Sequence, residues 1–104
     1  KKVHIFNKPN EAVKDADVIF SDKVISLNDK VNVKQKLSHF KSFRITPNLI
    51  KKANKDCIFL HCLPRGPEVD RKVFLSKRSK VWHQALNRVH VQKSILLYCF
   101  DKLR

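Results

Sequence analysis

Two short apolar runs of the chain end in side chains that could bind a ligand or take part in a reaction. The run DVIFSD at 17–22 ends in Asp22, and the run CIFLHCLP at 57–64 carries His61 and Cys62 near its end. Open parallel sheets bind ligands at the carboxyl ends of their strands. If both runs are parallel strands of one sheet, a carboxylate, an imidazole and a thiol share one edge, where they could border an active site.

Each of these side chains also has a purely structural explanation. Asp22 could form a turn, Cys62 could be a small buried apolar residue, and His61 could be a hydrogen-bonded histidine at a strand end. Farther along the chain, Arg88 lies at the edge of an apolar helical stripe, where its guanidinium could reach water or bind an anion. The residue types alone leave both explanations open.

The apolar pattern indicates the elements that would position these side chains. The run at 57–64 is apolar almost throughout, as is typical of a strand buried on both faces of a helix-covered parallel sheet. The alternation of strands and helices predicts an α/β fold, a partial doubly wound parallel sheet followed by a long amphipathic C-terminal helix. The expected strands are 3–6, 17–22 and 57–64, and the expected helices are a stretch from Pro9, 34–43, a stretch from Pro47 capped by Thr46, 69–74 and 80–103.

The charge of the chain raises an alternative class of function. Its 104 residues carry a net charge of +14, so a basic nucleic-acid-binding module has to be considered. The lysines are spread along the chain, and aromatic residues are not interleaved with them as stacking platforms would require. We therefore expect no nucleic-acid partner. The apolar stretch SILLYCF is too short to span a bilayer, so we expect no membrane partner either.

The cysteines and glycines limit the cofactors. Cys57, Cys62 and Cys99 lie in apolar contexts without a secretory signal, which predicts reduced thiols and a cytoplasmic location. The spacing of Cys57, His61 and Cys62 does not match a zinc site. Gly66 is the chain's single glycine, which excludes a glycine-rich phosphate loop. We expect no metal and no organic cofactor.

Three segments, in the correct order, resemble the ornithine carbamoyltransferases. HCLP at 61–64 is similar to that family's HCLP segment, and its cysteine favours the ornithine over the aspartate branch. VWHQALNRVHVQKSIL at 81–96 resembles the closing helix with the signature Q-A-E-N-R, in which Leu86 replaces Glu. PNEAVKDADVIFSD at 9–22 resembles the family's stretch D-P-x-E-A-V-x-x-A-D-V-x-Y-T-D.

The resemblance implies the C-terminal part of an enzyme of arginine biosynthesis. That enzyme transfers the carbamoyl group of carbamoyl phosphate to the δ-amine of L-ornithine and forms citrulline and phosphate. Residues 1–80 would belong to a Rossmann-like ornithine-binding domain, and the helix at 81–104 would pack on a carbamoyl-phosphate domain that this chain does not contain. The family forms trimers. The chain has no initiating methionine, and we expect the fragment alone to be inactive.

The resemblance also implies roles for individual residues. Ornithine would contact Asp22, Ser26, Leu27 and Cys62; carbamoyl phosphate would contact Cys62, Leu63 and Arg88; Cys62 and Arg88 would be catalytic, with His61 and Pro64 in support. The family's loop D-x-W-x-S-M-G is altered here, with Leu27 in place of Met and Asn28 in place of Gly. A related transferase acting on putrescine or acetylornithine therefore stays open as an alternative.

Overall fold

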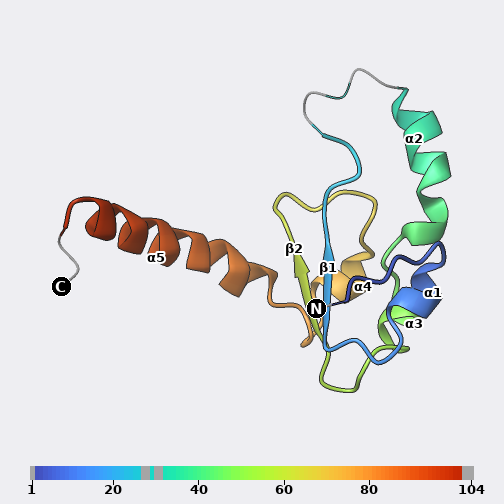
Figure 1. The fold of residues 1–104 in the computed structure, drawn as a ribbon. Coiled ribbons are helices and arrows are strands. Elements are labelled where there is room, and N and C mark those ends of the chain that lie inside the picture. Colours follow the sequence, from blue (N-terminus) through green and yellow to red (C-terminus); the bar gives the residue numbers. More distant parts are fainter. Residues whose placement is uncertain (1, 27–28, 30–31, 102–104) are drawn as a thin grey trace.

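The structure, a computed structural model, describes residues 2–26, 29 and 32–101. Its centre is a pair of strands, β1 (Val18–Ser21) and β2 (Ile58–His61). The helices are α1 (Pro9–Ala12), α2 (Val33–His39), α3 (Pro47–Ile50), α4 (Arg71–Phe74) and α5 (Val81–Cys99), and the short 3-10 helix η1 (Lys41–Phe43) follows α2. In Figure 1, α1, α3 and α4 lie on one side of the strands and α5 extends away on the other.

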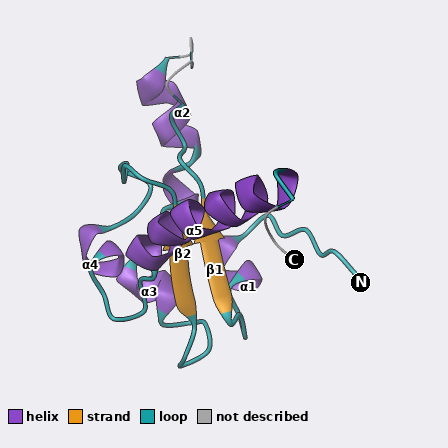
Figure 2. Cartoon of the chain, turned by 90° about the vertical axis from the view of Figure 1, so that its left-hand side faces the viewer, coloured by secondary structure: helices purple, strands orange, loops and turns teal. Residues whose placement is uncertain are grey.

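The two strands run parallel, which confirms the predicted α/β fold with its long C-terminal helix. Their register places Val18 opposite Ile58 and Ser21 opposite His61, so both strands end at the same edge. Figure 2 shows them side by side.

Strand β2 forms backbone hydrogen bonds on both edges. On the β1 side, the Ile58 N–H donates to the Asp17 carbonyl at 2.9 Å. On the other side, the Phe59 N–H donates to the Arg78 carbonyl and the Phe59 carbonyl accepts from the Lys80 N–H, both at 2.8 Å. The segment that leads into α5 is thereby fixed beside β2.

The Phe59 and His61 side chains are fully buried, whereas Ile58 and Leu60 on the other face are only partly buried. In β1, Val18 and Phe20 are more than half exposed, so the prediction of strands buried on both faces is wrong for these residues: one face of the sheet is covered and the other is partly open.

The helices next to the sheet begin at side-chain caps. The Thr46 hydroxyl accepts from the Leu49 N–H at 3.2 Å, which confirms the predicted helix start at Thr46-Pro47. Asp70 caps α4 by accepting from the Lys72 N–H at 2.8 Å. Leu49 and Ile50 of α3 and Val73 and Phe74 of α4 belong to the same buried cluster as Phe59. The buried cluster consists of Val13, Ile19, Ile45, Leu49, Ile50, Cys57, Phe59, Val69, Val73, Phe74 and Val81.

Several expected elements differ from the structure. The helix expected over PNEAVKDA at 9–16 ends at Ala12, and the helix expected to continue through NLIKKANKD at 48–56 ends at Ile50. The strand expected at 3–6 is not formed, and Val3 and Ile5 are 89% and 91% exposed. A strand requires a neighbour for its backbone groups, and no described segment lies beside these residues to provide one. The helix expected at 34–43 starts at Val33 and is divided into α2 and η1.

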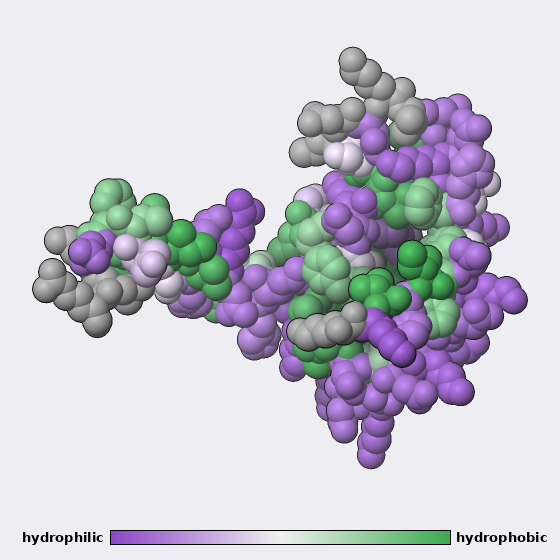
Figure 3. All heavy atoms as spheres, in the orientation of Figure 1, coloured by the Kyte–Doolittle hydropathy of each residue, from purple (hydrophilic) through white to green (hydrophobic). Residues whose placement is uncertain are grey.

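Helix α5 carries many exposed apolar side chains. Of its residues only Val81 is buried, whereas Trp82, Leu96 and the following Phe100 are 60%, 57% and 70% exposed. Figure 3 shows the resulting hydrophobic surface along the outer part of α5. Trp82 alone among these touches an aromatic ring of the body, Phe74, edge-on at 5.9 Å between centroids. None of the helices in the described part combines the length and apolar character needed to cross a bilayer.

Candidate functional site

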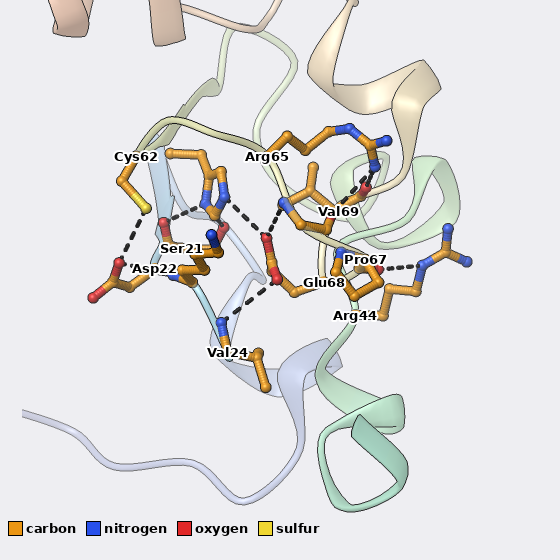
Figure 4. Close-up of polar contacts among 12 residues, drawn as sticks. Ser21, Asp22, Val24, Arg44, Cys62, Arg65, Pro67, Glu68 and Val69 are labelled. Carbon is orange, nitrogen blue, oxygen red and sulfur yellow. Dashed lines mark hydrogen bonds and ion pairs between the residues drawn. The ribbon is translucent and has the colours of Figure 1, made fainter. Parts of the chain in front are cut away.

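The ends of β1 and β2 bring Asp22 and Cys62 into contact, as their positions after parallel strands predict. The Cys62 thiol donates to Asp22 Oδ1 at 3.2 Å (Figure 4). The same oxygen accepts from the Lys23 N–H at 2.7 Å. A carboxylate and a thiol from residues forty positions apart thus form one polar pair at the carboxyl edge of the sheet.

The surroundings of this pair shift the pKa of both partners. The Lys23 N–H, followed by the Cys62 thiol, stabilises the carboxylate and holds the pKa of Asp22 below its ordinary value. Burial, followed by the neighbouring carboxylate, raises the pKa of the Cys62 thiol. Near neutral pH the pair is therefore an anion beside a protonated thiol. Cys62 acts as a hydrogen-bond donor here rather than as a thiolate nucleophile.

His61 is buried and held from both ring nitrogens. Its side chain is fully inaccessible, with Nδ1 2.7 Å from the Ser21 carbonyl and 3.1 Å from the Ser21 hydroxyl. Nε2 lies 3.1 Å from Glu68 Oε1, close enough for an ion pair when the ring is protonated, although the contact is not a well-directed hydrogen bond. These contacts tie the two strand ends together and leave the ring fixed in place.

Glu68 is a buried acid that the sequence did not single out as a site residue. Its side chain is 5% exposed, and Oε1 accepts from the Gly66 N–H at 2.7 Å while Oε2 accepts from the Val24 N–H at 3.5 Å (Figure 4). A Cβ at Gly66 would lie within 3.0 Å of all three atoms of the Glu68 carboxyl group. Gly66 has no positive φ, so a larger residue here would be opposed by the Glu68 carboxyl group and not by backbone strain. Glu68 links the loop after β2 to the loop after β1.

Two open grooves flank the Asp22–Cys62 pair. The Arg88 groove, about 550 Å³, lies between the end of β2 and α5, and the Asp22 groove, about 450 Å³, lies between the end of β1 and the segment 36–45. The Arg88 groove is lined by His61, Cys62, Leu63, Gln84, Ala85, Asn87, Arg88 and Val91. The Asp22 groove is lined by Ser21, Asp22, Lys23, Val24, Lys36, Phe40, Phe43, Ile45 and Glu68. The polar pair therefore separates a groove with a guanidinium from a groove with a carboxylate.

The structure brings some of the predicted residues together and not others. Leu63 and Arg88 share the Arg88 groove with Cys62, and Pro64 follows Leu63 through a cis peptide bond. Ser26 is exposed and lines neither groove; its N–H donates to Asp29 Oδ2 at 2.8 Å. Leu27 and Asn28 lie outside the described residues.

Two further contacts shape the site and were not predicted. The Gln84 side chain accepts from the His61 N–H at 3.0 Å, and Lys36 pairs with Asp29 at 2.6 Å. Gln84 belongs to the Q-A-E-N-R resemblance, which was the only sequence signal for it. In the described part of the chain, no three His, Cys, Asp or Glu side chains are arranged to hold a metal ion.

The arrangement defines an α/β ligand-binding domain of the type that binds at the carboxyl edge of a parallel sheet. Comparison with known proteins identifies the family. The sequence profile of the aspartate/ornithine carbamoyltransferase Asp/Orn binding domain matches residues 1–99. The chain belongs to this family.

Individual relatives agree with this assignment. The ornithine carbamoyltransferase of Methanococcus maripaludis (strain C5) is 49% identical over 96 residues, which cover 89% of this chain and 32% of the relative. Among solved structures, the Pyrococcus furiosus ornithine carbamoyltransferase superposes with a TM-score of 0.78 at 42% identity, covering 86% of this chain and 29% of that one. The anabolic enzyme of Campylobacter jejuni gives 0.81 at 35%, covering 91% and 32%. The chain thus spans about a third of its relatives' length.

Proposed function

We propose that this chain is the ornithine-side part of an ornithine carbamoyltransferase. The observation that carries the proposal is the Asp22–Cys62 contact at the junction of two grooves, one with a carboxylate and one with Arg88. In the reaction, the neutral δ-amine of L-ornithine attacks the carbonyl carbon of carbamoyl phosphate. A C–N bond forms, the C–O bond to phosphate breaks, and the amine loses one proton. The products are L-citrulline and phosphate.

Ornithine occupies the Asp22 groove in this proposal. The Asp22 carboxylate stays ionised because its pKa is lowered, so it pairs with the substrate's α-ammonium group through a charge-assisted hydrogen bond. Ser26 and Leu27 complete the contact with the amino acid. The Cys62 thiol, kept protonated by its raised pKa, lies between the two grooves and helps to position the attacking amine.

Carbamoyl phosphate occupies the Arg88 groove. Arg88 offers a permanently charged fork of N–H donors to the oxygens of carbamoyl phosphate. The backbone at Cys62 and Leu63 borders the carbamoyl NH₂ group, and Pro64 ends the strand there. His61 supports the strand end through its contacts with Ser21 and Glu68. Rate acceleration then comes from positioning and electrostatics, without a covalent enzyme intermediate or a cofactor.

The exposed apolar side chains of α5 support the packing of a second domain on this helix in the complete enzyme. Residues 1–80 form part of the ornithine domain, and the helix at 81–104 packs on a carbamoyl-phosphate domain. Trp82, Leu86 and Val89 are each more than half exposed, as expected of side chains that another domain covers. The complete enzyme is a cytoplasmic homotrimer of arginine biosynthesis in this proposal, and the 104-residue chain alone is inactive.

The test is a chimera in which residues 2–101 replace the corresponding segment of the Pyrococcus furiosus enzyme. The folded chimera is expected to form citrulline from ornithine and carbamoyl phosphate, with little product from putrescine or acetylornithine. Product from one of the other amines alone would overturn the ornithine assignment. A folded chimera that binds carbamoyl phosphate and carbamoylates none of the three amines would overturn the proposal as a whole. The unmodified Pyrococcus enzyme is the positive control.

A further inference from the structure

The His61 N–H lies on the edge of β2 that faces α5. Backbone N–H groups of a strand alternate between its two neighbours. The Ile58 N–H points to β1, so the N–H groups of Phe59 and His61 point the other way. Phe59 meets the Arg78 carbonyl there, but the chain turns into α5 before a backbone carbonyl can meet His61.

The side chain of Gln84 supplies the missing acceptor. Its Oε1 lies 3.0 Å from the His61 nitrogen, in line with the two backbone bonds that Phe59 makes to Arg78 and Lys80. The side-chain oxygen thus extends the row of hydrogen bonds along this edge of β2 beyond the last backbone bond, which Lys80 makes. Gln84 is half-buried and its own N–H bonds to the Lys80 carbonyl at 2.9 Å, so it sits in the first turn of α5.

This bond also ties the helix that carries Arg88 to the end of β2. Residues four apart lie on the same face of a helix, so Gln84 and Arg88 face the same groove one turn apart. Both line the Arg88 groove with Cys62 and Leu63. Within this chain, α5 is held against the body by the buried Val81, by the Trp82 contact with Phe74 and by the Gln84 hydrogen bond to β2, and of these only Gln84 lines the Arg88 groove. The Gln84–His61 bond is therefore a direct link between the helix of the guanidinium and the strand end before Cys62.

We propose that Gln84 is a positioning residue that sets the distance and orientation of Arg88 relative to Cys62 and Leu63. This inference rests on the proposed function for its kinetic consequence, but the bond itself can be tested without activity. The carbonyl oxygen of Gln84 is the group that matters. A glutamate at this position retains an acceptor of the same reach, whereas a methionine has similar length and helix propensity but no strong acceptor.

The experiment compares Gln84→Met with Gln84→Glu in the chimera. Exchange of the His61 amide, measured by residue-resolved mass spectrometry, is expected to accelerate at least about tenfold in Gln84→Met because the buried N–H loses its partner. Gln84→Glu is expected to keep the amide protected. Gln92→Met makes the same change on an exposed residue of α5 and should leave His61 exchange unaltered.

Steady-state kinetics supply the second measurement. Gln84→Met is expected to lower kcat by about tenfold or more, as a misplaced electrostatic group would. Gln84→Glu should keep kcat within about threefold, with a raised KM for the anionic carbamoyl phosphate. Unchanged His61 exchange in Gln84→Met, or equal loss of kcat in both variants, overturns the positioning role. If the unsubstituted chimera is inactive, the proposed function fails while the exchange measurement still decides whether Gln84 holds His61.

Discussion

The thiol of Cys62 lies 3.2 Å from Oδ1 of Asp22, across the ends of two parallel strands. The Lys23 N–H, followed by the Cys62 thiol, lowers the pKa of the Asp22 carboxyl group, and burial, followed by the Asp22 carboxylate, raises the pKa of the Cys62 thiol. The strand ends therefore do not provide a reactive thiolate. They provide a thiol that donates a hydrogen bond and a carboxylate anion that accepts it.

Asp22→Asn is expected to make Cys62 more reactive. Asparagine keeps an oxygen that can accept from the thiol but carries no negative charge, so the pKa of Cys62 falls toward the ordinary value of 9.0, although burial still raises it. Alkylation by iodoacetamide at pH 8, followed by mass spectrometry, should be several-fold faster at Cys62 in this variant. Cys57, which is buried, should react slowly in both proteins. Equal rates at Cys62 would contradict the coupling.

Much of this edge could be predicted from the sequence, because it depends on local periodicity. Two continuous apolar runs indicate parallel strands, and parallel strands place Asp22 and Cys62 at one edge whatever the details of the loops. The same runs also predicted burial on both faces, which is wrong for Val18 and Phe20. The Thr46 cap is equally local, since its side chain bonds to an N–H three residues away.

Glu68 and Gln84 could not be found in this way. Each acts on a residue far away in the sequence: Glu68 on Val24, and Gln84 on His61. The spacing of apolar residues does not show that a glutamate after a turn will be buried. Nor does it show that a glutamine of a surface helix will accept a hydrogen bond from the backbone of a strand. The strand expected at 3–6 failed for the opposite reason, because its local pattern was suitable but no strand among the described residues pairs with it.

Gly66→Ala is expected to destabilise the fold by about 1–3 kcal/mol, because the added Cβ collides with a buried carboxyl group that cannot move freely. In a Glu68→Ala background the collision is gone, and the same change should be neutral or slightly stabilising through the unfolded chain. A double-mutant cycle on the thermal unfolding of the chimera measures this coupling. Additive effects of the two changes would show that Gly66 is not required for space.

Asp29→Asn tests the ion pair with Lys36. The hydrogen bond from Lys36, followed by that from the Ser26 N–H, lowers the pKa of Asp29 below its ordinary value of 3.8. A carboxyl group whose pKa is lowered by folding stabilises the folded state at pH values above its ordinary pKa. This stabilisation is lost as the pH falls through the pKa of the folded state. The wild-type chimera should therefore be more stable than Asp29→Asn at pH 7, and the difference should shrink below about pH 4. Urea unfolding at both pH values measures it, and a difference that persists at low pH would assign the effect to something other than the carboxylate.

Arg88→Ala tests the guanidinium in the groove beside Cys62. We expect kcat/KM for carbamoyl phosphate to fall by about 10²-fold or more in the chimera, because a fixed positive charge on the substrate oxygens is lost. Lys93→Ala is the matched control: it removes one positive charge from an exposed position of the same helix, outside the groove, and should change kcat/KM little. The Arg88 effect should persist at high ionic strength, because a direct contact is screened less than a long-range attraction. If both variants lose activity equally and salt abolishes the difference from wild type, Arg88 contributes only to the overall positive field of the chain.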